Sequence, residues 1–245
     1  MTTPSPWETQ AENWVAWART PGHDVFPHFF PAFIEEIAPP PGGRTLEIGC
    51  GEGRVLRELA AHGHDVTGLD VSPTLAARAR EADTRPAYAL GDATSLPFAD
   101  AAFETVIAYN ALQAMTRPGD MARAVRECAR VLRPGGRLCL CVGHPMTDVG
   151  HVRSIDDAGA MVTSGAYFDH RYVDETVTKD GLTMNFHGWT FAIEDYARAL
   201  EDAGLVIERL REPRPRAGGA SGWLARWRRV PLFLFVRALK VTGVR

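Results

Sequence analysis

Short apolar runs alternate with amphipathic stretches from residue 44 onward. The apolar runs predict five strands, at 45–48, 65–69, 87–90, 104–108 and 137–142. The stretches between them place apolar residues at helical spacing and predict helices at 53–62, 73–82 and 118–132. Strands that alternate with helices are typical of βαβ units, so we expect a parallel sheet with right-handed crossovers.

The regular pattern is preceded by two predicted helices, at 7–20 and 27–37. It is interrupted after the fifth strand by an insert, 144–189, with no helical periodicity. Within the insert, two alternating stretches flank Lys179-Asp180-Gly181, a turn sequence typical of a β-hairpin. We therefore expect the insert to place a hairpin over 171–189.

The last part of the chain returns to the earlier pattern. A helix is predicted at 193–203 and a strand at 205–210. The Pro-, Gly- and Arg-rich stretch 213–222 is expected to be a solvated loop. The apolar segment 231–239 predicts a final strand, which we expect to run antiparallel at or near the sheet edge.

Composition narrows the class of protein. The 245 residues include 27 Lys and Arg against 30 Asp and Glu, a net charge of −3, which disfavours general binding to a nucleic-acid backbone. The sequence has no apolar run of 18 residues and no secretory signal, so we expect a cytoplasmic protein without a membrane span. The four cysteines form no CxxC pair and are expected to be buried thiols rather than zinc ligands.

The net charge conceals an uneven distribution. The segment 209–245 contains ten basic residues and one acid, a net charge of +9. Two interpretations stay open: a solvated basic edge, or a patch that helps to hold an anionic acceptor or partner.

The most informative motif is Glu47-Ile48-Gly49-Cys50-Gly51-Glu52-Gly53, between the first predicted strand and the next helix. Glycines at alternate positions let the backbone turn sharply and approach a ligand closely. The free N–H groups at the start of the following helix then face that ligand. The motif therefore predicts a ligand-binding loop.

Polar residues follow the next strands at their carboxyl ends. Asp70 follows the second strand, Asp92 the third, and Tyr109-Asn110 the fourth. In a doubly wound sheet these ends converge on one crevice. A carboxylate at the position of Asp70 can accept two hydrogen bonds from a ribose diol.

A nicotinamide dinucleotide is the main rival ligand. Its fingerprint, GxGxxG or GxGxxA, requires a small sixth residue, whereas Arg54 stands there. A carboxylate at Glu47 suits an ammonium group and has no use beside a pyrophosphate. The residues thus favour a nucleoside that carries an amino-acid moiety.

Together with three further motifs, the glycine motif resembles the class I S-adenosylmethionine-dependent methyltransferases. These motifs are Leu69-Asp70-Val71-Ser72, Gly91-Asp92-Ala93 and Leu132-Arg133-Pro134-Gly135-Gly136. The similarity is strongest to their small-molecule branch, typified by quinone-biosynthesis enzymes, and covers 44–142 well and 192–240 more weakly. It implies a Rossmann-like α/β fold with a seven-stranded, mostly parallel sheet whose last strand is reversed.

The resemblance also implies a division of the chain. We expect one methyltransferase domain over 1–245, with N-terminal helices at 1–43 and a cofactor-binding core at 44–143. These segments are followed by an acceptor cap at 144–190 and by a C-terminal helix with antiparallel strands at 191–245.

The resemblance implies that the cofactor is S-adenosylmethionine, which becomes S-adenosylhomocysteine after methyl transfer. Glu47, Gly49 and Gly51 are expected to hold the methionine end, with Cys50 and Gly53 in the same loop. The remaining implied positions are Asp70 for the ribose hydroxyls, Val71, Asp92 and Ala93 for the adenine, and Tyr109 and Asn110 beside the methionine.

Two histidines are candidate bases for an acceptor that must lose a proton. His144 follows the fifth strand at the crevice, and His187 lies on the second hairpin strand, shortly before the helix at 193–203. Gln113 stands where similar enzymes often carry a histidine. An equally open interpretation is that both histidines only satisfy local contacts.

Aromatic residues of the first helix and the hairpin are expected to wall a hydrophobic acceptor pocket. They are Trp14, Trp17, Tyr172 and Trp189. The alternative is that they form a small core of their own.

The predicted reaction is methyl transfer to oxygen, nitrogen or carbon of a small metabolite, without a metal ion. We expect neither a nucleic-acid nor a membrane partner, and a homodimer stays open. A rival function is a methyltransferase fold that binds the cofactor but serves a cyclisation or acts as a binding module.

Overall fold

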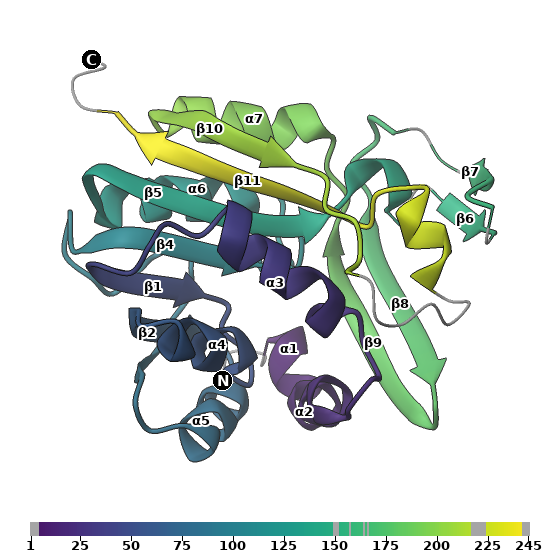
Figure 1. Ribbon diagram of the computed structural model, residues 1–245, viewed down its shortest axis with the longest axis horizontal. Helices are drawn as coiled ribbons and strands as arrows, with labels where there is room; N and C mark the ends of the chain where they lie inside the picture. The colour runs from purple at the N-terminus through teal and green to yellow at the C-terminus, as the bar shows by residue number, and fades with distance from the viewer. Residues whose placement is uncertain are drawn as a thin grey trace.

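A computed structural model describes residues 5–148, 152–156, 158–163, 165, 167–216 and 224–241. Its centre is a seven-stranded sheet with the order β10-β11-β5-β4-β1-β2-β3 (Figure 1). All neighbours from β5 to β3 pair in parallel, and β11 runs antiparallel to both β5 and β10. The structure confirms the Rossmann-like α/β fold and its reversed last strand.

The sheet strands occupy the expected positions, except that β5 begins at Leu132 and thus includes the Pro-Gly-Gly segment expected to precede it. They are β1 (Arg44–Ile48), β2 (Asp65–Asp70), β3 (Ala87–Leu90), β4 (Phe103–Tyr109), β5 (Leu132–Gly143), β10 (Leu205–Arg211) and β11 (Phe233–Lys240). The interior strands are covered on both faces, which explains their nearly continuous apolar sequences.

The helices follow the predicted order along the chain. They are α1 (Pro6–Thr9), α2 (Ala11–Arg19), α3 (Phe26–Glu36), α4 (Arg54–Ala61), α5 (Pro73–Ala82), α6 (Asp120–Val131) and α7 (Ile193–Asp202). The start of α5 is fixed as its sequence suggests, because the Ser72 hydroxyl accepts a hydrogen bond from Leu75 N at 3.1 Å and Pro73 occupies the first turn.

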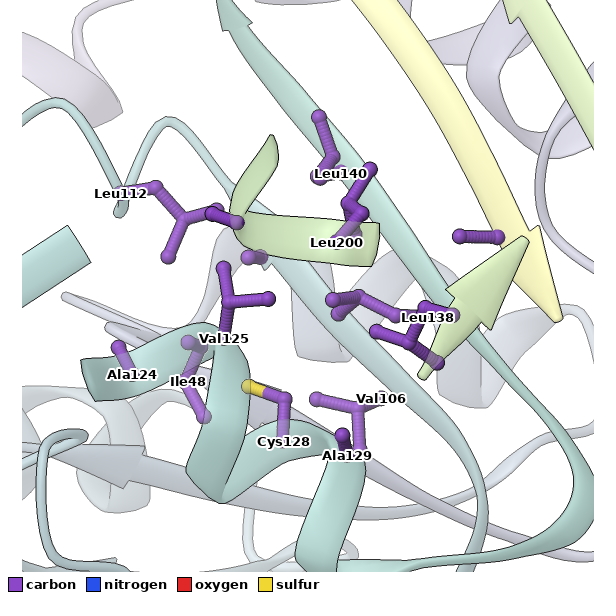
Figure 2. Close-up of a cluster of buried hydrophobic side chains, with 14 of the residues drawn as sticks. Ile48, Val106, Leu112, Ala124, Val125, Cys128, Ala129, Leu138, Leu140 and Leu200 are labelled. Atoms are coloured by element: carbon purple, nitrogen blue, oxygen red, sulfur yellow. The ribbon is translucent and has the colours of Figure 1, made fainter. Parts of the chain in front are cut away.

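Helices cover both faces of the sheet. Helices α6 and α7 pack on one face, where the buried cluster of Figure 2 joins Val125 and Cys128 of α6 and Leu200 of α7 to the strands. Helices α3 and α4 cover the other face around Phe33 and Phe235. The sheet between these two layers holds the carboxyl ends of β1 to β4 in fixed positions.

The structure differs from the sequence predictions at several boundaries. The helix expected at 7–20 is divided into α1 and α2 at Gln10, and α6 ends at Val131, before the Pro-Gly-Gly turn. Strand β11, by contrast, lies next to the edge strand β10 and so has the expected position near the sheet edge. The insert also contains a second short strand pair, β6 (Val152–Ile155) and β7 (Met161–Thr163), which the sequence pattern did not reveal.

The predicted hairpin is formed by β8 (Tyr172–Lys179) and β9 (Leu182–Trp189). It packs beside α2 at the carboxyl edge of the sheet (Figure 1). Its tip is attached to the loop after α2, where Lys179 Nζ donates to the His23 carbonyl. Its other end meets the loop after β4, because Trp189 N donates to the Gln113 carbonyl at 2.9 Å.

Gly188 sits where this hairpin meets the loop after β4. A Cβ atom at this position would overlap the Gln113 carbonyl oxygen. We expect Gly188→Ala to destabilise the protein by about 1–3 kcal/mol through overpacking. Thermal unfolding should show a Tm lowered by about 2–4 °C per kcal/mol. Gly42→Ala is the control, because no atom lies within 4 Å of its added Cβ, and equal Tm values for the two variants would contradict this account.

Acidic residues neutralise part of the basic C-terminal segment. Arg211 pairs with Glu36 at 3.0 Å, and Arg237 pairs with Glu208 at 3.1 Å. The loop predicted at 213–222 lies partly outside the described residues. Within the residues that the structure describes, no helix has the length and apolar character needed to span a membrane.

Candidate active site

The glycine loop connects β1 to α4 at the carboxyl edge of the sheet. Gly49 and Gly51 have positive φ angles of 64° and 56°, in the left-handed region that favours glycine. A Cβ at Gly49 would lie 2.7 Å from the Ala111 Cβ, so the loop after β4 also requires glycine here. The sequence Gly49-Cys50-Gly51 therefore keeps the backbone close to both the sheet edge and any ligand.

Asp70 ends β2 beside this loop and is only 5% exposed. Its two carboxylate oxygens each accept one backbone hydrogen bond, from Gly51 N at 2.8 Å and from Ser72 N at 2.9 Å. Burial raises the pKa of Asp70, and these N–H groups oppose the shift. Each oxygen keeps a second lone pair, so the carboxylate can also accept hydrogen bonds from two ligand hydroxyls.

Glu47 lies in β1, where it is 1% exposed. Its Oε2 atom has no hydrogen-bond partner among the described residues, although buried polar atoms normally have one. Burial raises the pKa of Glu47 well above its usual range, and the nearby charge of Asp70 raises it further. A ligand ammonium group would satisfy this carboxylate, so the residue fits the amino-acid end of S-adenosylmethionine.

The residues that the resemblance places beside the adenine lie at the next part of the sheet's carboxyl edge. Val71 is 43% exposed and presents an apolar surface to the cavity. Asp92 is held by Thr94, whose N–H donates at 2.8 Å, and by Arg117, at 3.1 Å. Its carboxylate thus keeps a fixed orientation beside Ala93.

Tyr109 and Asn110 end β4. Tyr109 is buried among phenylalanines of α3, and burial raises its pKa well above the usual range. Asn110 has a positive φ of 57°, and its Oδ1 atom accepts a hydrogen bond from Gln113 Nε2 at 3.2 Å. This turn directs the loop after β4 toward the hairpin.

These residues surround a cavity of about 780 Å³, a size suited to a cofactor together with a small acceptor. Ten of the eleven predicted cofactor residues line it, and Gly53, at the start of α4, is the exception. Helices α1 and α2 and the β8–β9 hairpin supply the opposite wall, including Trp7, Trp14, Val173 and Phe186.

The structure separates the two candidate bases. His187 lines the cavity, and its Nδ1 atom lies 3.4 Å from Asp174 Oδ1 of β8. His144 does not line it. Both ring nitrogens of His144 have other partners, because Nδ1 accepts from Met146 N at 3.1 Å and Nε2 lies 2.9 Å from Glu212 Oε1. Burial lowers the pKa of His144, which suits a neutral ring at the start of the short 3₁₀ helix η1 (Pro145–Thr147).

The predicted aromatic wall is also divided. Trp14 and Trp189 line the cavity, whereas Trp17 and Tyr172 lie outside its lining. Trp17 packs against Phe186, with ring centroids 5.6 Å apart. Tyr172 is 41% exposed and lies behind Trp189, at a centroid distance of 5.5 Å.

Sequence reasoning assigned no binding role to several residues that line the cavity. Trp7 is one of them, and its Nε1 atom donates to the Ala114 carbonyl at 2.9 Å. Gln113 and Arg54 also line the cavity. The position of Gln113 just after β4 was the available signal, because that loop lies at the same edge as the glycine loop.

Arg54, which argued against a dinucleotide, is held in place by aromatic rings. Its guanidinium lies 5.0 Å from the Trp14 ring centroid and 4.4 Å from that of Phe26, and it pairs with Asp24. Among the residues described, no cluster of three or more His, Cys, Asp or Glu side chains is arranged to hold a metal ion.

Known proteins share both the sequence and the fold of this site. A methyltransferase-domain family matches residues 46–140. The 27-O-demethylrifamycin SV methyltransferase of Amycolatopsis mediterranei (strain S699) is 40% identical over 185 residues, which cover 68% of this chain and 67% of that protein.

Solved structures extend the similarity over most of the chain. An S-adenosylmethionine-dependent methyltransferase from Mesorhizobium loti is 27% identical, with a TM-score of 0.67 over 86% of this chain and 97% of that one. The cyclase SpnF has the same fold, with a TM-score of 0.63 and 19% identity over 99% of this chain and 100% of its own.

The chain therefore belongs to the class I S-adenosylmethionine-dependent methyltransferases. It is an enzyme of this class, and S-adenosylmethionine is its cofactor.

Proposed function

We propose that this enzyme methylates a hydroxyl oxygen of a small, hydrophobic, ring-bearing molecule. The observation that carries the proposal is the position of His187, which lines the same cavity as the cofactor residues and has Asp174 beside Nδ1. The relative from Amycolatopsis mediterranei bears the name of a methyltransferase for 27-O-demethylrifamycin SV, which supports an oxygen acceptor. Transfer of the methyl group to a nitrogen or carbon atom would contradict the proposal of an oxygen acceptor.

We further propose that the residues implied by the resemblance bind the cofactor. Asp70 would accept hydrogen bonds from the ribose hydroxyls, and Glu47 would pair with the ammonium group. Val71 and Asp92 would flank the adenine. When bound, S-adenosylmethionine supplies a methyl group activated by its sulfonium charge.

The chain has two tasks in this reaction. It holds the acceptor oxygen in line with the methyl group, and alignment of this kind lowers a barrier by several kcal/mol. It also removes the hydroxyl proton, for which the His187 imidazole is the candidate base because this residue lines the cavity. Apolar groups on the hairpin and α2, including Phe186 and Trp14, keep water from the reacting atoms.

In this proposal, the cofactor and the acceptor are bound by different segments of the chain. The core at 44–143 carries the cofactor. The cap at 144–190 and helices α1 and α2 enclose the acceptor, because their side chains form the wall opposite the glycine loop.

Label transfer tests the reaction directly. The enzyme is incubated with methyl-labelled S-adenosylmethionine and a panel of phenols, amines and activated carbon acids, and the products are analysed by mass spectrometry. The proposal predicts labelled methyl ethers together with S-adenosylhomocysteine. Cofactor binding without transfer to any acceptor would instead support the cyclisation or binding role, for which the shared fold of SpnF provides a precedent.

Glu47→Gln should raise the stability of the ligand-free protein and weaken the binding of S-adenosylhomocysteine. A buried carboxylate with a raised pKa destabilises the folded protein as the pH rises from the ordinary glutamate pKa to the raised one. Without ligand, the variant should therefore unfold a few degrees higher than the wild type near neutral pH, since about 1 kcal/mol corresponds to roughly 2–4 °C. Its affinity for S-adenosylhomocysteine should fall at least about tenfold because the ammonium loses its charged partner.

Glu52→Gln is the matched control for stability. Glu52 is as buried as Glu47, but Arg19 lies 2.7 Å and Arg57 2.9 Å from its carboxylate. Its neutralisation should lower the Tm, because a buried ion pair would lose one charge. A lower Tm for Glu47→Gln, or unchanged ligand affinity, would contradict the proposed role of Glu47.

A further inference from the structure

Two neighbouring residues of the cavity lining, Gln113 and Trp189, each carry a buried polar atom that the proposed reaction does not use. Gln113 Oε1 and Trp189 Nε1 are both buried, and neither has a hydrogen-bond partner in the described part of the chain. Because an unpaired buried polar atom costs about 1–3 kcal/mol, such atoms in a cavity wall point to a ligand that pairs with them.

The two residues are held next to each other. Trp189 N donates to the Gln113 carbonyl at 2.9 Å, and Gly188 allows this close approach. The Gln113 amide is oriented by the hydrogen bond from its Nε2 to Asn110 Oδ1 at 3.2 Å. The Trp189 ring is supported from behind by Tyr172. Both atoms are therefore fixed before any ligand binds, which reduces the entropy cost of binding.

The chemistry of the pair is complementary. Gln113 Oε1 only accepts hydrogen bonds, and Trp189 Nε1 only donates them. A ligand with a single hydrogen-bonding atom would leave one of them unpaired unless that atom reached both. His187 lies next to Trp189 in β9, with only Gly188 between them, so the base and the polar pair lie at the same part of the cavity wall.

We propose that Gln113 and Trp189 select the acceptor by hydrogen bonding. They recognise a ring system that carries a hydroxyl group and, on a neighbouring atom, a second oxygen that accepts a hydrogen bond. This hydroxyl, which is distinct from the one that loses its proton to His187, donates to Gln113 Oε1, and the second oxygen accepts from Trp189 Nε1. The inference rests on the proposed function, because it places the acceptor beside His187, but it concerns recognition rather than transfer.

Three naphthalene probes test this selection by calorimetry on the enzyme saturated with S-adenosylhomocysteine. The first, 3-methoxy-2-naphthol, has a hydroxyl group and a neighbouring ether oxygen. The others, 2-naphthol and 2-methoxynaphthalene, each lack one of these groups. We expect the first probe to bind about tenfold more tightly than either of the others. Equal affinities for the three probes, or no binding of any of them, would overturn the proposal.

Variants assign the preference to individual atoms. Trp189→Phe keeps an aromatic ring but removes the N–H donor, and should reduce the preference over 2-naphthol to less than about threefold. Gln113→Met removes the acceptor oxygen and should abolish the preference over 2-methoxynaphthalene, while Asn110 Oδ1 keeps the Cys141 thiol at 3.6 Å. Trp227→Phe, outside the cavity lining, is the control and should leave both preferences unchanged. An unchanged preference in both cavity variants would overturn the proposal.

Methyl transfer is measured separately. The probe preference without any labelled product would support this recognition site and count against the proposed reaction. Labelled product without the probe preference would support the reaction and overturn the recognition site.

Discussion

Replacing Asp70 with alanine is expected to weaken the binding of S-adenosylhomocysteine by about 1–3 kcal/mol, the loss expected for hydrogen bonds to a charged group. This corresponds to a roughly five- to 150-fold increase in Kd. The expectation follows from geometry: the carboxylate is buried, is oriented by Gly51 N and Ser72 N, and retains one acceptor site on each oxygen. Isothermal titration calorimetry measures the effect.

The orienting hydrogen bonds require a control for folding. Asp70→Asn keeps one oxygen acceptor and should give a smaller loss of affinity than alanine. Asp65→Ala, an exposed position at the opposite end of β2, should leave the affinity unchanged. If Asp70→Ala binds S-adenosylhomocysteine as tightly as the wild type, Asp70 does not hold the ribose.

Replacing His187 with alanine is expected to lower kcat at least tenfold, because a positioned general base contributes about 10²–10⁴-fold to proton transfer. The side chain is 12% exposed, lines the cavity and has Asp174 3.4 Å from Nδ1. The measurement is the rate of label transfer to the best hydroxyl acceptor at saturating cofactor. The effect should fall on kcat rather than on cofactor affinity.

Two further variants distinguish a base from a packing residue. Asp174→Asn should give an intermediate rate because it only positions the ring. His62→Ala, at an exposed helix end, is the control. A wild-type rate for His187→Ala would return this histidine to a packing role.

The clustering of the candidate cofactor residues could be predicted because these residues are tied to strand ends. Once β1, β2 and β4 are parallel neighbours, Glu47, Asp70 and Asn110 must meet at one edge. Local sequence defines those strands, so no long-range information is needed. An apolar segment near the end of the chain predicted the final strand, and the resemblance implied a sheet whose last strand is reversed.

The acceptor half was less predictable because long-range contacts decide it. His144 and His187 looked equivalent in sequence, yet Glu212, 68 positions away, lies within hydrogen-bond distance of the first. Trp14 and Trp17 share one face of a helix, but Phe186 of the hairpin covers Trp17 and leaves Trp14 at the cavity. Such distinctions depend on how the insert docks, which short-range periodicity does not specify.

A crystal structure of the complex with S-adenosylhomocysteine would test the central claim most directly, namely that one cavity holds the cofactor beside His187. The account predicts the ribose hydroxyls at Asp70, the ammonium at Glu47, and the sulfur facing the wall formed by Gln113, His187 and Trp189. A ligand bound elsewhere, or a sulfur atom that faces away from this wall, would contradict it.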